Sequence, residues 1–556
     1  MQIRVDRTLF SASDLVNYLE CEHLTGLDLV NLETPLPRAA ADEQVKLIQD
    51  KGYEHEDAYL ADLQVTTVDI VDAKVAGQTI EAAVEATHAA MRQGAAVIYQ
   101  ACFRADNFVG YVDFLRRVET PSELGDYSYE VVDTKLARSP RAKFIIQLCL
   151  YSELLSGIQG VLPRQIHLVM GDRTEQSYRL ANYYRYYRKI KACFLEAVSR
   201  SAGNTYPMPC AHCDLCDWRE LCQQQWQQDD HLVQVANISR TQIEKLNAAG
   251  VATLQQLAGL GEKHRVPGLQ PETFSRLRRQ AALQFARRES GEDCYALIET
   301  EPGQLRGFQR LPEPDDGDLF FDMEGDPLEE GGLEYLFGVY YRENGKYRFQ
   351  PFWAHDRQQE REAFRDFMAF VMERLERYPG MHIYHYAAYE ETALKRLMSL
   401  HGVCEAEVDH LLRTERLVDL YKVVREGLMV SEQRYSIKNL EAFYMEKRAG
   451  EVTNAGASIV YYENWKATGD QELLDRIQDY NEDDCRSTYL LREWLLRLRP
   501  ADIPWYDGTP DAGDDDSKSD NVHEAEARLA YYHERLLGTL PADRAQWGDE
   551  ARMREL

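Results

Sequence analysis

Two strand-like segments, far apart in the chain, carry acidic residues where a buried strand would carry apolar ones. The segment YSYEVVDTK holds Asp133 and Lys135, and the segment DLFFDMEGD holds Asp322 and Glu324. Alternate residues of a strand project to the same face, so each pair shares one face. A carboxylate placed there costs several kcal/mol unless it is paired or binds a cation. The chain therefore predicts two separate polar sites, each beside a sheet.

The chain has 556 residues, too many for one core, because a domain usually takes roughly 100 to 200 residues. Changes in composition predict an α/β multidomain protein with parts at 1–225, 226–292, 293–500 and 501–556, the last an acidic linker with a terminal helix. No run of about 18 apolar residues occurs, and the first residues lack the apolar stretch of a signal peptide. We therefore expect a cytoplasmic protein with no membrane partner.

The acidic balance is the main argument from composition against a nucleic-acid partner. The formal charge is -29, from 64 Lys and Arg against 93 Asp and Glu. Phosphate repels a diffuse negative field. The objection is weak, however, because metal-dependent nucleases need carboxylates at the site and a local basic groove is enough to hold a strand.

The first polar site combines two strands. Asp113 lies in the apolar segment GYVDFLRRVE, upstream of Asp133 and Lys135. Two carboxylates can hold a divalent cation, and the ammonium of Lys135 can orient or deprotonate a water and offset transition-state charge. A D-x-K sequence alone is common by chance, so the inference depends on the residues around it.

Two helices complete an ordered set. His55 lies on a predicted helix upstream, and Gln147 and Tyr151 share one helix face downstream, because they are four residues apart. A helix His, a strand Asp, a D-x-K strand and a Q-x-x-x-Y helix, in this order, resemble the RecB-like branch of the PD-(D/E)xK nucleases. That fold is therefore expected for residues 1–225. The implied roles are metal ligation by His55, Asp113 and Asp133, catalysis by Asp113, Asp133 and Lys135, and DNA contact by Gln147 and Tyr151.

Cysteines gather at the end of this part. CDLCDWRELC gives C-x2-C-x5-C at Cys213, Cys216 and Cys222, with Cys210 just before them. In a cytoplasmic chain such clustering favours a metal or cluster site over disulfides. A fourth thiolate could come from Cys21 or from Cys210.

The iron-sulfur variant of the RecB-like family has one cysteine before the nuclease core and three after it. The resemblance therefore implies a [4Fe-4S] cluster held by Cys21, Cys213, Cys216 and Cys222, with a structural role. Zinc is the alternative, because four thiolates suit both metals. Four unligated buried thiols are the simplest alternative.

The second polar site joins a strand and a distant helix. Asp322 and Glu324 share the strand face, and Tyr480 and Asp484 share a helix face in RIQDYNEDDCRSTYLLREWLL. These D-x-E and Y-x3-D elements resemble the DEDDy branch of the RNase H-like exonucleases. The resemblance implies Mg2+ or Mn2+ on Asp322, Glu324 and Asp484, with Tyr480 orienting the attacking water. D-x-E alone is common on acidic surfaces.

One element departs from that family. A further Asp usually ends an H-N-x-x-F-D motif, whereas the matching stretch here is HYAAYE, with Glu390 at the acidic position and Tyr386 where Asn is expected. A longer carboxylate can still reach a metal, so Glu390 is kept as a predicted ligand. The departure is the feature that points to the alternative of a decayed nuclease site.

Between the two sites, ISRTQIEKLNAAGVATLQQLAGL has apolar residues spaced by three and four with a break at Gly250. This pattern is typical of a small helix-hairpin-helix connector, which presents backbone amides to phosphates without reading bases. Five arginines follow: Arg276, Arg278, Arg279, Arg287 and Arg288. They could strengthen that grip, or they could form the solvated face of a packing helix.

The whole arrangement resembles a bacterial family of RecB-like nucleases in which a superfamily 1 helicase often follows on the same chain. No G-x4-G-K-[ST] loop occurs here, so a helicase is expected as a partner or as a fused part missing from this chain. We predict a metal-dependent DNA nuclease with two active sites, acting on DNA ends or single-stranded DNA in repair or in defence against foreign DNA. The alternatives are a nucleic-acid-binding scaffold with one decayed nuclease site that works with a helicase, and an RNA-directed exonuclease.

Overall fold

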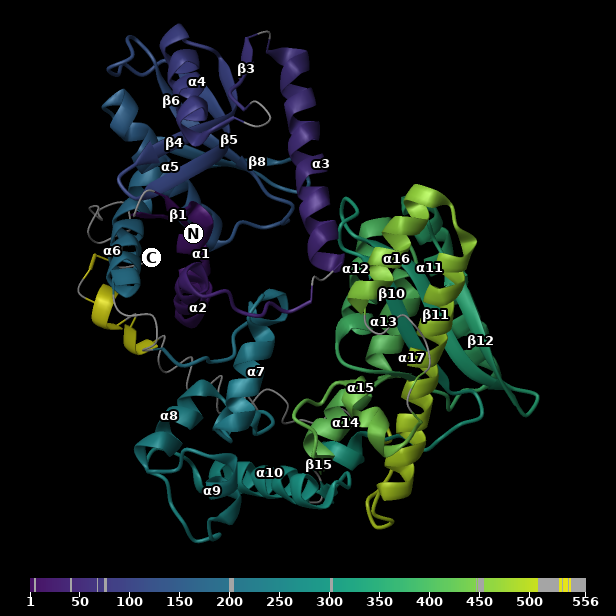
Figure 1. Cartoon of the computed structure of the whole chain (residues 1–556). Helices are drawn as coiled ribbons and strands as arrows, with labels where there is room; N and C mark the ends of the chain where they lie inside the picture. The colour runs from purple at the N-terminus through teal and green to yellow at the C-terminus, as the bar shows by residue number, and fades with distance from the viewer. Residues whose placement is uncertain are drawn as a thin grey trace. The chain divides into compact units, whose positions relative to one another are not determined.

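The computed structural model describes residues 1–4, 7–40, 43–67, 69–74, 78–199, 205–300, 304–446, 448, 455–508, 530–532, 534–538 and 540–541. Contacts divide the chain into two compact units, 1–222 with 515–556, and 223–514. Each unit has its own sheet and core (Figure 1), as expected of a mixed α/β chain with several domains. The linker and terminal helix predicted for 501–556 lie largely outside the described residues. None of the described helices combines the length and apolar character needed to span a bilayer.

The first unit is built on a six-stranded sheet of order β3-β4-β5-β6-β7-β8. Its strands are β3 (Ile70–Asp72), β4 (Val97–Ala105), β5 (Phe108–Val118), β6 (Ser128–Thr134), β7 (Gln165–Val169) and β8 (Glu175–Arg179), and a separate hairpin pairs β1 (Gln2–Arg4) with β2 (Arg7–Leu9). Strands β4, β5 and β6 run antiparallel, whereas β6 and β7 are parallel. A parallel pair needs a crossover, and helix α5 (Ala142–Gln159) supplies it.

Helix α5 is the central helix of this unit. Its sequence FIIQLCLYSELL is apolar almost all round, as expected of a helix buried on several sides, and it ends at Gly160 with φ +72°. It packs on β4, β5, β6 and β7. The other helices are α1 (Ala12–Glu20), α2 (Glu22–Glu33), α3 (Glu43–Thr66), α4 (Ile80–Gln93) and α6 (Tyr184–Ser199), and the boundary between the two units falls within α7 (Arg219–Gln228).

The second unit begins with the predicted helical connector. Helices α8 (Arg240–Ala248) and α9 (Leu254–Gly259) are separated at Gly250, whose φ of +81° allows the turn. Capping boxes at Ser239 and Thr253 start the two helices. Helix α10 (Pro271–Ser290) follows. Its function as a phosphate-binding unit stays a prediction.

A five-stranded sheet of order β12-β11-β10-β13-β14 forms the centre of the second unit. Its strands are β10 (Leu319–Asp326), β11 (Leu333–Glu343), β12 (Lys346–Trp353), β13 (Ile383–His385) and β14 (Leu417–Asp419), and a separate pair joins β9 (Tyr295–Leu297) to β15 (Leu428–Val430). The first three strands are antiparallel, and β13 and β14 extend the sheet in parallel beside β10. The predicted turn between Glu343 and Lys346 is present, with positive φ at Asn344 and Gly345.

Helices cover both faces of this sheet. They are α11 (Arg357–Arg377), α12 (Tyr389–His401), α13 (Glu405–Arg413), α14 (Leu420–Gly427), α15 (Ile437–Leu440), α16 (Ala455–Thr468) and α17 (Gln471–Leu498). Phe321 and Met323 of β10 share a core with α11, whereas Phe320 shares a core with Leu491 of α17. Because side chains alternate along a strand, Asp322 and Glu324 face the α17 side.

The pairing of β10 with β11 contains one irregularity. The register shifts between Glu324, which pairs with Leu336, and Gly325, which pairs with Glu334. Tyr335 is therefore the extra residue of a β-bulge. Its ring stacks on Tyr462 of α16, with the ring centroids 3.9 Å apart.

Candidate nuclease sites

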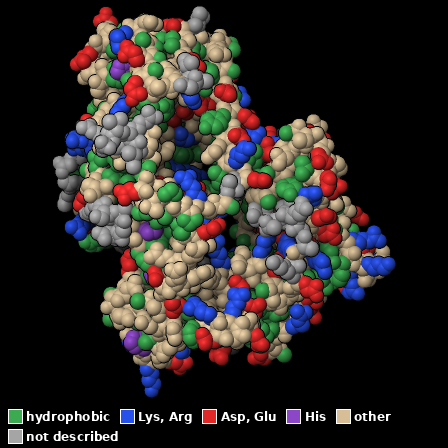
Figure 2. All heavy atoms as spheres, viewed as in Figure 1, with side chains coloured by type: hydrophobic (Ala, Val, Ile, Leu, Met, Phe, Trp, Pro, Cys, Tyr) green, Lys and Arg blue, Asp and Glu red, His purple; other side chains and the backbone are tan. Residues whose placement is uncertain are grey.

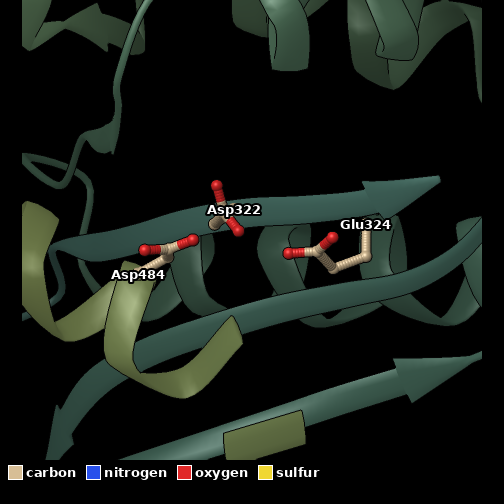
Figure 3. A group of neighbouring side chains, drawn as sticks. All are labelled: Asp322, Glu324 and Asp484. Carbon is tan, nitrogen blue, oxygen red and sulfur yellow. The ribbon is translucent and has the colours of Figure 1, made fainter. Parts of the chain in front are cut away.

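The most closely held acidic group lies between β10 and α17. Asp322 and Glu324 project from β10 and Asp484 projects from α17, as Figure 3 shows. One carboxylate oxygen from each residue lies within 4.8 Å of the other two. Across the described ranges, no other three His, Cys, Asp or Glu side chains converge this closely. This acidic triad can therefore hold a metal ion.

The electrostatics of the acidic triad favour a bound cation. Burial, followed by the charges of Asp484 and Glu324, raises the pKa of Asp322 well above its usual value. Burial and then Asp484 raise the pKa of Glu324 to about 8. A divalent cation between the oxygens would relieve this repulsion. An all-oxygen donor set suits Mg2+ or Mn2+.

Asn481 orients one of these carboxylates. It is fully buried on α17, and its Nδ2 donates to Asp322 Oδ2 at 2.7 Å. Gly338 lies opposite Asp322 on β11, and a Cβ there would lie 1.6 Å from Asn481 Oδ1. Only glycine leaves room for this contact. The sequence prediction missed Asn481, although its spacing of three from Asp484 places both on one helix face.

Tyr480 and two cations complete this site. The Lys438 ammonium, from α15, donates to the Tyr480 hydroxyl, and its Nζ lies 4.1 Å from the ring centroid. Arg448 forms an ion pair with Asp484 at 2.6 Å. Burial and then the charge of Asp484 raise the pKa of Tyr480, so the phenol stays protonated. The sequence prediction missed both cations, because no residue spacing connects them with α17.

The remaining predicted ligand, Glu390, is not part of the acidic triad. It lies in the first turn of α12 with 4% exposure, and its Oε2 is 3.4 Å from His385 Nδ1. Its charge nevertheless contributes to the raised pKa of Asp322. Tyr386, which stands where Asn was expected, donates its hydroxyl to the carbonyl oxygen of Tyr435.

The N-terminal carboxylates lie on β5 and β6. Asp113 Oδ2 accepts hydrogen bonds from the backbone N–H and the hydroxyl of Thr134, each at 2.8 Å. Asp133, 1% exposed, pairs with Lys135. Burial raises the pKa of Asp133 to about 7, although Lys135 opposes the shift and Asp113 adds to it. The three predicted residues therefore lie together, but the described ligand atoms form no group as compact as the acidic triad.

Helix α3 offers a residue next to the predicted histidine. His55 directs Nε2 toward the carbonyl oxygen of Val169 at 3.4 Å. Glu56, 7% exposed, accepts a hydrogen bond from Gln100 Nε2. Burial and then the charge of Asp113 raise the pKa of Glu56. Glu56 therefore interacts electrostatically with Asp113, whereas the sequence prediction named only its neighbour His55.

The predicted DNA-facing pair lies on α5. Gln147 Nε2 donates to the Tyr151 hydroxyl at 3.0 Å. Tyr151 is buried over Gly110, where a Cβ would come within 2.9 Å of its ring. Gln147 is half-buried, so it is the more accessible member of the pair.

The cysteines of two distant segments interact. The Sγ atoms of Cys210 and Cys213 are 3.8 Å apart. Burial raises the pKa of Cys21, and Cys210 adds to the shift. Burial raises the pKa of Cys222 to about 12, followed by the effects of Cys216, Cys21, Cys213 and Cys210. Cys21 also packs against the core cluster that contains Cys216 and Trp218. No three of the described cysteine sulfurs lie within 4.8 Å of one another.

Most of the arginines of the connector have protein partners. The ion pairs are Arg278–Glu262, Arg287–Asp293 and Arg288–Asp230. Arg279 donates to the carbonyl oxygen of Leu297 at 3.4 Å. These contacts favour the alternative in which the arginines stabilise a packing helix.

Comparison with known proteins identifies the class of the second unit. Residues 319–496 match the family model of the RNase H superfamily, which covers β10, α12 and α17. The RNase H-like fold predicted for the C-terminal region is therefore confirmed. Proteins of this superfamily are generally phosphodiester hydrolases that use divalent metals, so the domain indicates nuclease activity on nucleic acid. No curated protein matches the chain.

Proposed function

We propose that this chain is a metal-dependent DNA nuclease with two active sites, acting on DNA ends or single-stranded DNA in repair or in defence against foreign DNA. The observation that carries the proposal is the acidic triad, in which three carboxylates, two of them from buried residues, converge within 4.8 Å in an RNase H-like domain. Such a group is costly to ionise unless a cation binds it. The net charge of -29 is compatible with a nucleic-acid partner, because basic and acidic side chains are interspersed over the face in Figure 2.

The acidic triad would work as a DEDDy-type exonuclease site. Mg2+ or Mn2+ bound there would stabilise charge on the attacking and leaving oxygens. Asp322, Glu324 and Asp484 would hold the metal, with Glu390 as a further ligand, and Asn481 fixes the orientation of Asp322. The Tyr480 hydroxyl directs a water at the phosphorus. The water oxygen bonds to phosphorus, the bond to the leaving oxygen breaks, and one water proton passes to that oxygen.

The N-terminal unit would carry a RecB-like PD-(D/E)xK site. Asp113 and Asp133 would bind the metal, and Lys135, already paired with Asp133, would orient the water. His55 would be the ligand from α3, and its neighbour Glu56, whose charge interacts with that of Asp113, would be a second candidate ligand. Gln147 would contact DNA, and the Tyr151 hydroxyl would hold the Gln147 side chain in place. A helicase, separate or fused, would supply the single strand.

The cysteines would hold a [4Fe-4S] cluster that ties the two ends of this unit together. Four sulfurs around one zinc ion lie about 3.8 Å apart, since the Zn–S bond is about 2.3 Å. The Sγ atoms of Cys210 and Cys213 lie at that distance, so zinc is the alternative to the cluster. Iron and acid-labile sulfide in anaerobically purified protein would test this assignment.

The two-site proposal is tested by removing each site in the full chain. Asp133→Ala, Asp322→Ala and the double variant are compared on labelled single- and double-stranded DNA and RNA, with Mg2+ or Mn2+. Each single variant should lose a separable cleavage activity, and the double variant should be inert. Undiminished cleavage by the double variant would falsify the proposal. Faster cleavage of RNA than of DNA would identify RNA as the substrate.

A scaffold with one decayed nuclease site is the second candidate. It is favoured by Glu390, which stands where the family has Asp and pairs with His385. Titration of the Asp133→Ala variant with Mn2+, followed by electron paramagnetic resonance, distinguishes the two-site nuclease from the scaffold. A second site that binds no Mn2+ supports the scaffold.

A further inference from the structure

We propose that Lys438 is a positioning residue for hydrolysis at the acidic triad, because its ammonium fixes the orientation of the Tyr480 hydroxyl toward the attacking water. This inference deepens the proposed function and rests on it. It assigns a role to a contact between α15 and α17, two helices far apart in the sequence.

Lys438 is held in place by its own helix. Helix α15 is a single turn, capped by the Ser436 side chain, which accepts from the N–H of Asn439. Leu440 anchors the turn in the buried core that it shares with Trp494 and Leu495 of α17. The backbone of Lys438 is therefore fixed relative to α17, and the side chain spans only the remaining gap to Tyr480.

The contact engages both parts of the tyrosine. The Lys438 ammonium donates to the hydroxyl and lies 4.1 Å from the ring centroid. Tyr480 is 5% exposed, so the contact is largely shielded from water. A shielded cation next to an aromatic ring and an oxygen acceptor interacts more strongly than one on the surface.

The hydrogen-bonding capacity of the phenol explains why the contact matters. A tyrosine hydroxyl has one donor hydrogen and two acceptor lone pairs. An ammonium can only donate, so Lys438 occupies one lone pair of the hydroxyl oxygen. The hydroxyl hydrogen and the second lone pair are then confined to the remaining directions, so a water bound to either is held in a fixed direction.

Lys438 shares the charge balance of the acidic triad with a second cation. Arg448 forms the ion pair with Asp484 at 2.6 Å. Removal of Lys438 would therefore leave Asp484 paired, and Lys438→Arg, which keeps the charge, separates the loss of charge from the release of the Tyr480 hydroxyl. A change in the orientation of one water should lower turnover more than substrate binding.

A double-mutant cycle in the full-length Asp133→Ala background tests this role. Lys438→Met should lower kcat about 10- to 100-fold with KM within about twofold. The double variant Lys438→Met/Tyr480→Phe should be no slower than Tyr480→Phe alone, because both remove one interaction. Lys438→Arg should recover part of the loss. Lys346→Met, an exposed lysine in the β11–β12 turn, is the matched control and should resemble the parent.

The inference would be overturned if the kcat losses of the two single variants multiplied in the double variant, or if Lys438→Met raised KM. Either result would show that Lys438 acts independently of Tyr480, for example by contacting the substrate. Asp322→Ala in the same background separates this failure from that of the proposed function. If Asp322→Ala is inactive and Lys438→Met is fully active, only the inference fails. If Asp322→Ala is fully active, the proposed site itself fails.

A readout without turnover completes the test. Fluorotyrosine installed at position 480 gives one 19F resonance that senses the phenol oxygen. The resonance should shift and broaden when Lys438→Met is added, without metal or substrate, and should stay in place with Lys346→Met. An unchanged resonance with an unchanged circular dichroism spectrum would contradict the inference. Lys438→Arg serves as the second variant if Lys438→Met does not fold.

Discussion

The two acidic sites differ in how their charge is balanced. At the N-terminal site, Asp133 pairs with Lys135 two residues away, and Thr134 between them donates to Asp113. At the acidic triad, the cations come from other elements, Lys438 and Arg448. Three carboxylates converge there, and burial with mutual repulsion raises the pKa of Glu324 to about 8. At the first site, the balancing charge comes from the same segment as the carboxylate. At the acidic triad, it comes from other elements, and a bound metal ion would relieve the repulsion that remains.

The largest effect is expected at the acidic triad. Asp484→Asn, in the Asp133→Ala background, removes a charge that a two-metal hydrolase needs, and should lower hydrolysis about 1000-fold or more. The corresponding Asp483→Asn, at the neighbouring position of α17, should cost less than tenfold by the same reasoning. Initial rates on end-labelled single strands measure both. Equal rates for the two variants would contradict a role of Asp484 in hydrolysis and with it the contrast between the two sites.

The next effect concerns the cysteines. Cys213→Ser should lower the stability of the N-terminal unit by about 4 kcal/mol or more, since loss of a structural metal group is among the most destabilising changes. Cys193→Ser, a cysteine of α6 outside the cluster, is the control. Urea unfolding with iron quantification under anaerobic conditions measures the change. Full stability with no bound metal would show that the thiols are only packed together.

A smaller effect distinguishes the two residues of α3. His55→Gln should weaken metal binding at the N-terminal site about tenfold, whereas Glu56→Gln should change it less, because Glu56 accepts a hydrogen bond from Gln100. Isothermal titration of Mn2+ into the Asp322→Ala background isolates that site. The reverse ranking would make Glu56 the ligand.

The smallest effect is a difference in pH dependence. A carboxyl with a raised pKa in the folded state binds its proton more tightly there than in the unfolded chain, so its contribution to stability falls as pH rises from about 4.5 to the folded pKa. In chelator, the unit with Glu324 should lose about 1 to 2 kcal/mol between pH 5.5 and 8. The unit with Asp133, whose pKa of about 7 already includes the opposing effect of Lys135, should lose less.

Hydrogen exchange of peptides from β10 and β6 reports the two units separately. Mg2+ should remove the pH dependence at β10, because it neutralises the carboxylates that repel one another. Asp322→Asn should flatten it without metal. Equal slopes for β10 and β6 would contradict the difference in charge balance.

Residues close together on one element were predictable from the sequence. Asp322 and Glu324 follow strand alternation, and Tyr480 and Asp484 follow helix spacing. The RNase H-like fold followed from the order of these elements and is confirmed. Lys438 and Arg448 could not be predicted, because their approach to α17 depends on the packing of α15 and the chain after it. No local period records such packing.

The choice between His55 and Glu56 as the ligand from α3 depends on packing in the same way. Both residues lie on α3, and adjacent residues of a helix point about 100° apart, so the rotation of α3 against the sheet decides which one faces Asp113. Sequence pattern places the helix but does not set this rotation. The iron-sulfur cluster and the PD-(D/E)xK activity stay predictions.

The β-bulge at Tyr335 gives β11 a residue that is free of the pairing with β10 and contacts helix α16. The extra residue lets Tyr335 stack on Tyr462 and reach Ser458 of α16, with the two hydroxyl oxygens 2.5 Å apart, beside Glu324. Helix α16 is thus fastened to the strand by side chains rather than by ladder hydrogen bonds. Substitutions at these contacts can alter the surroundings of the acidic triad while the strand that carries Asp322 keeps its pairing.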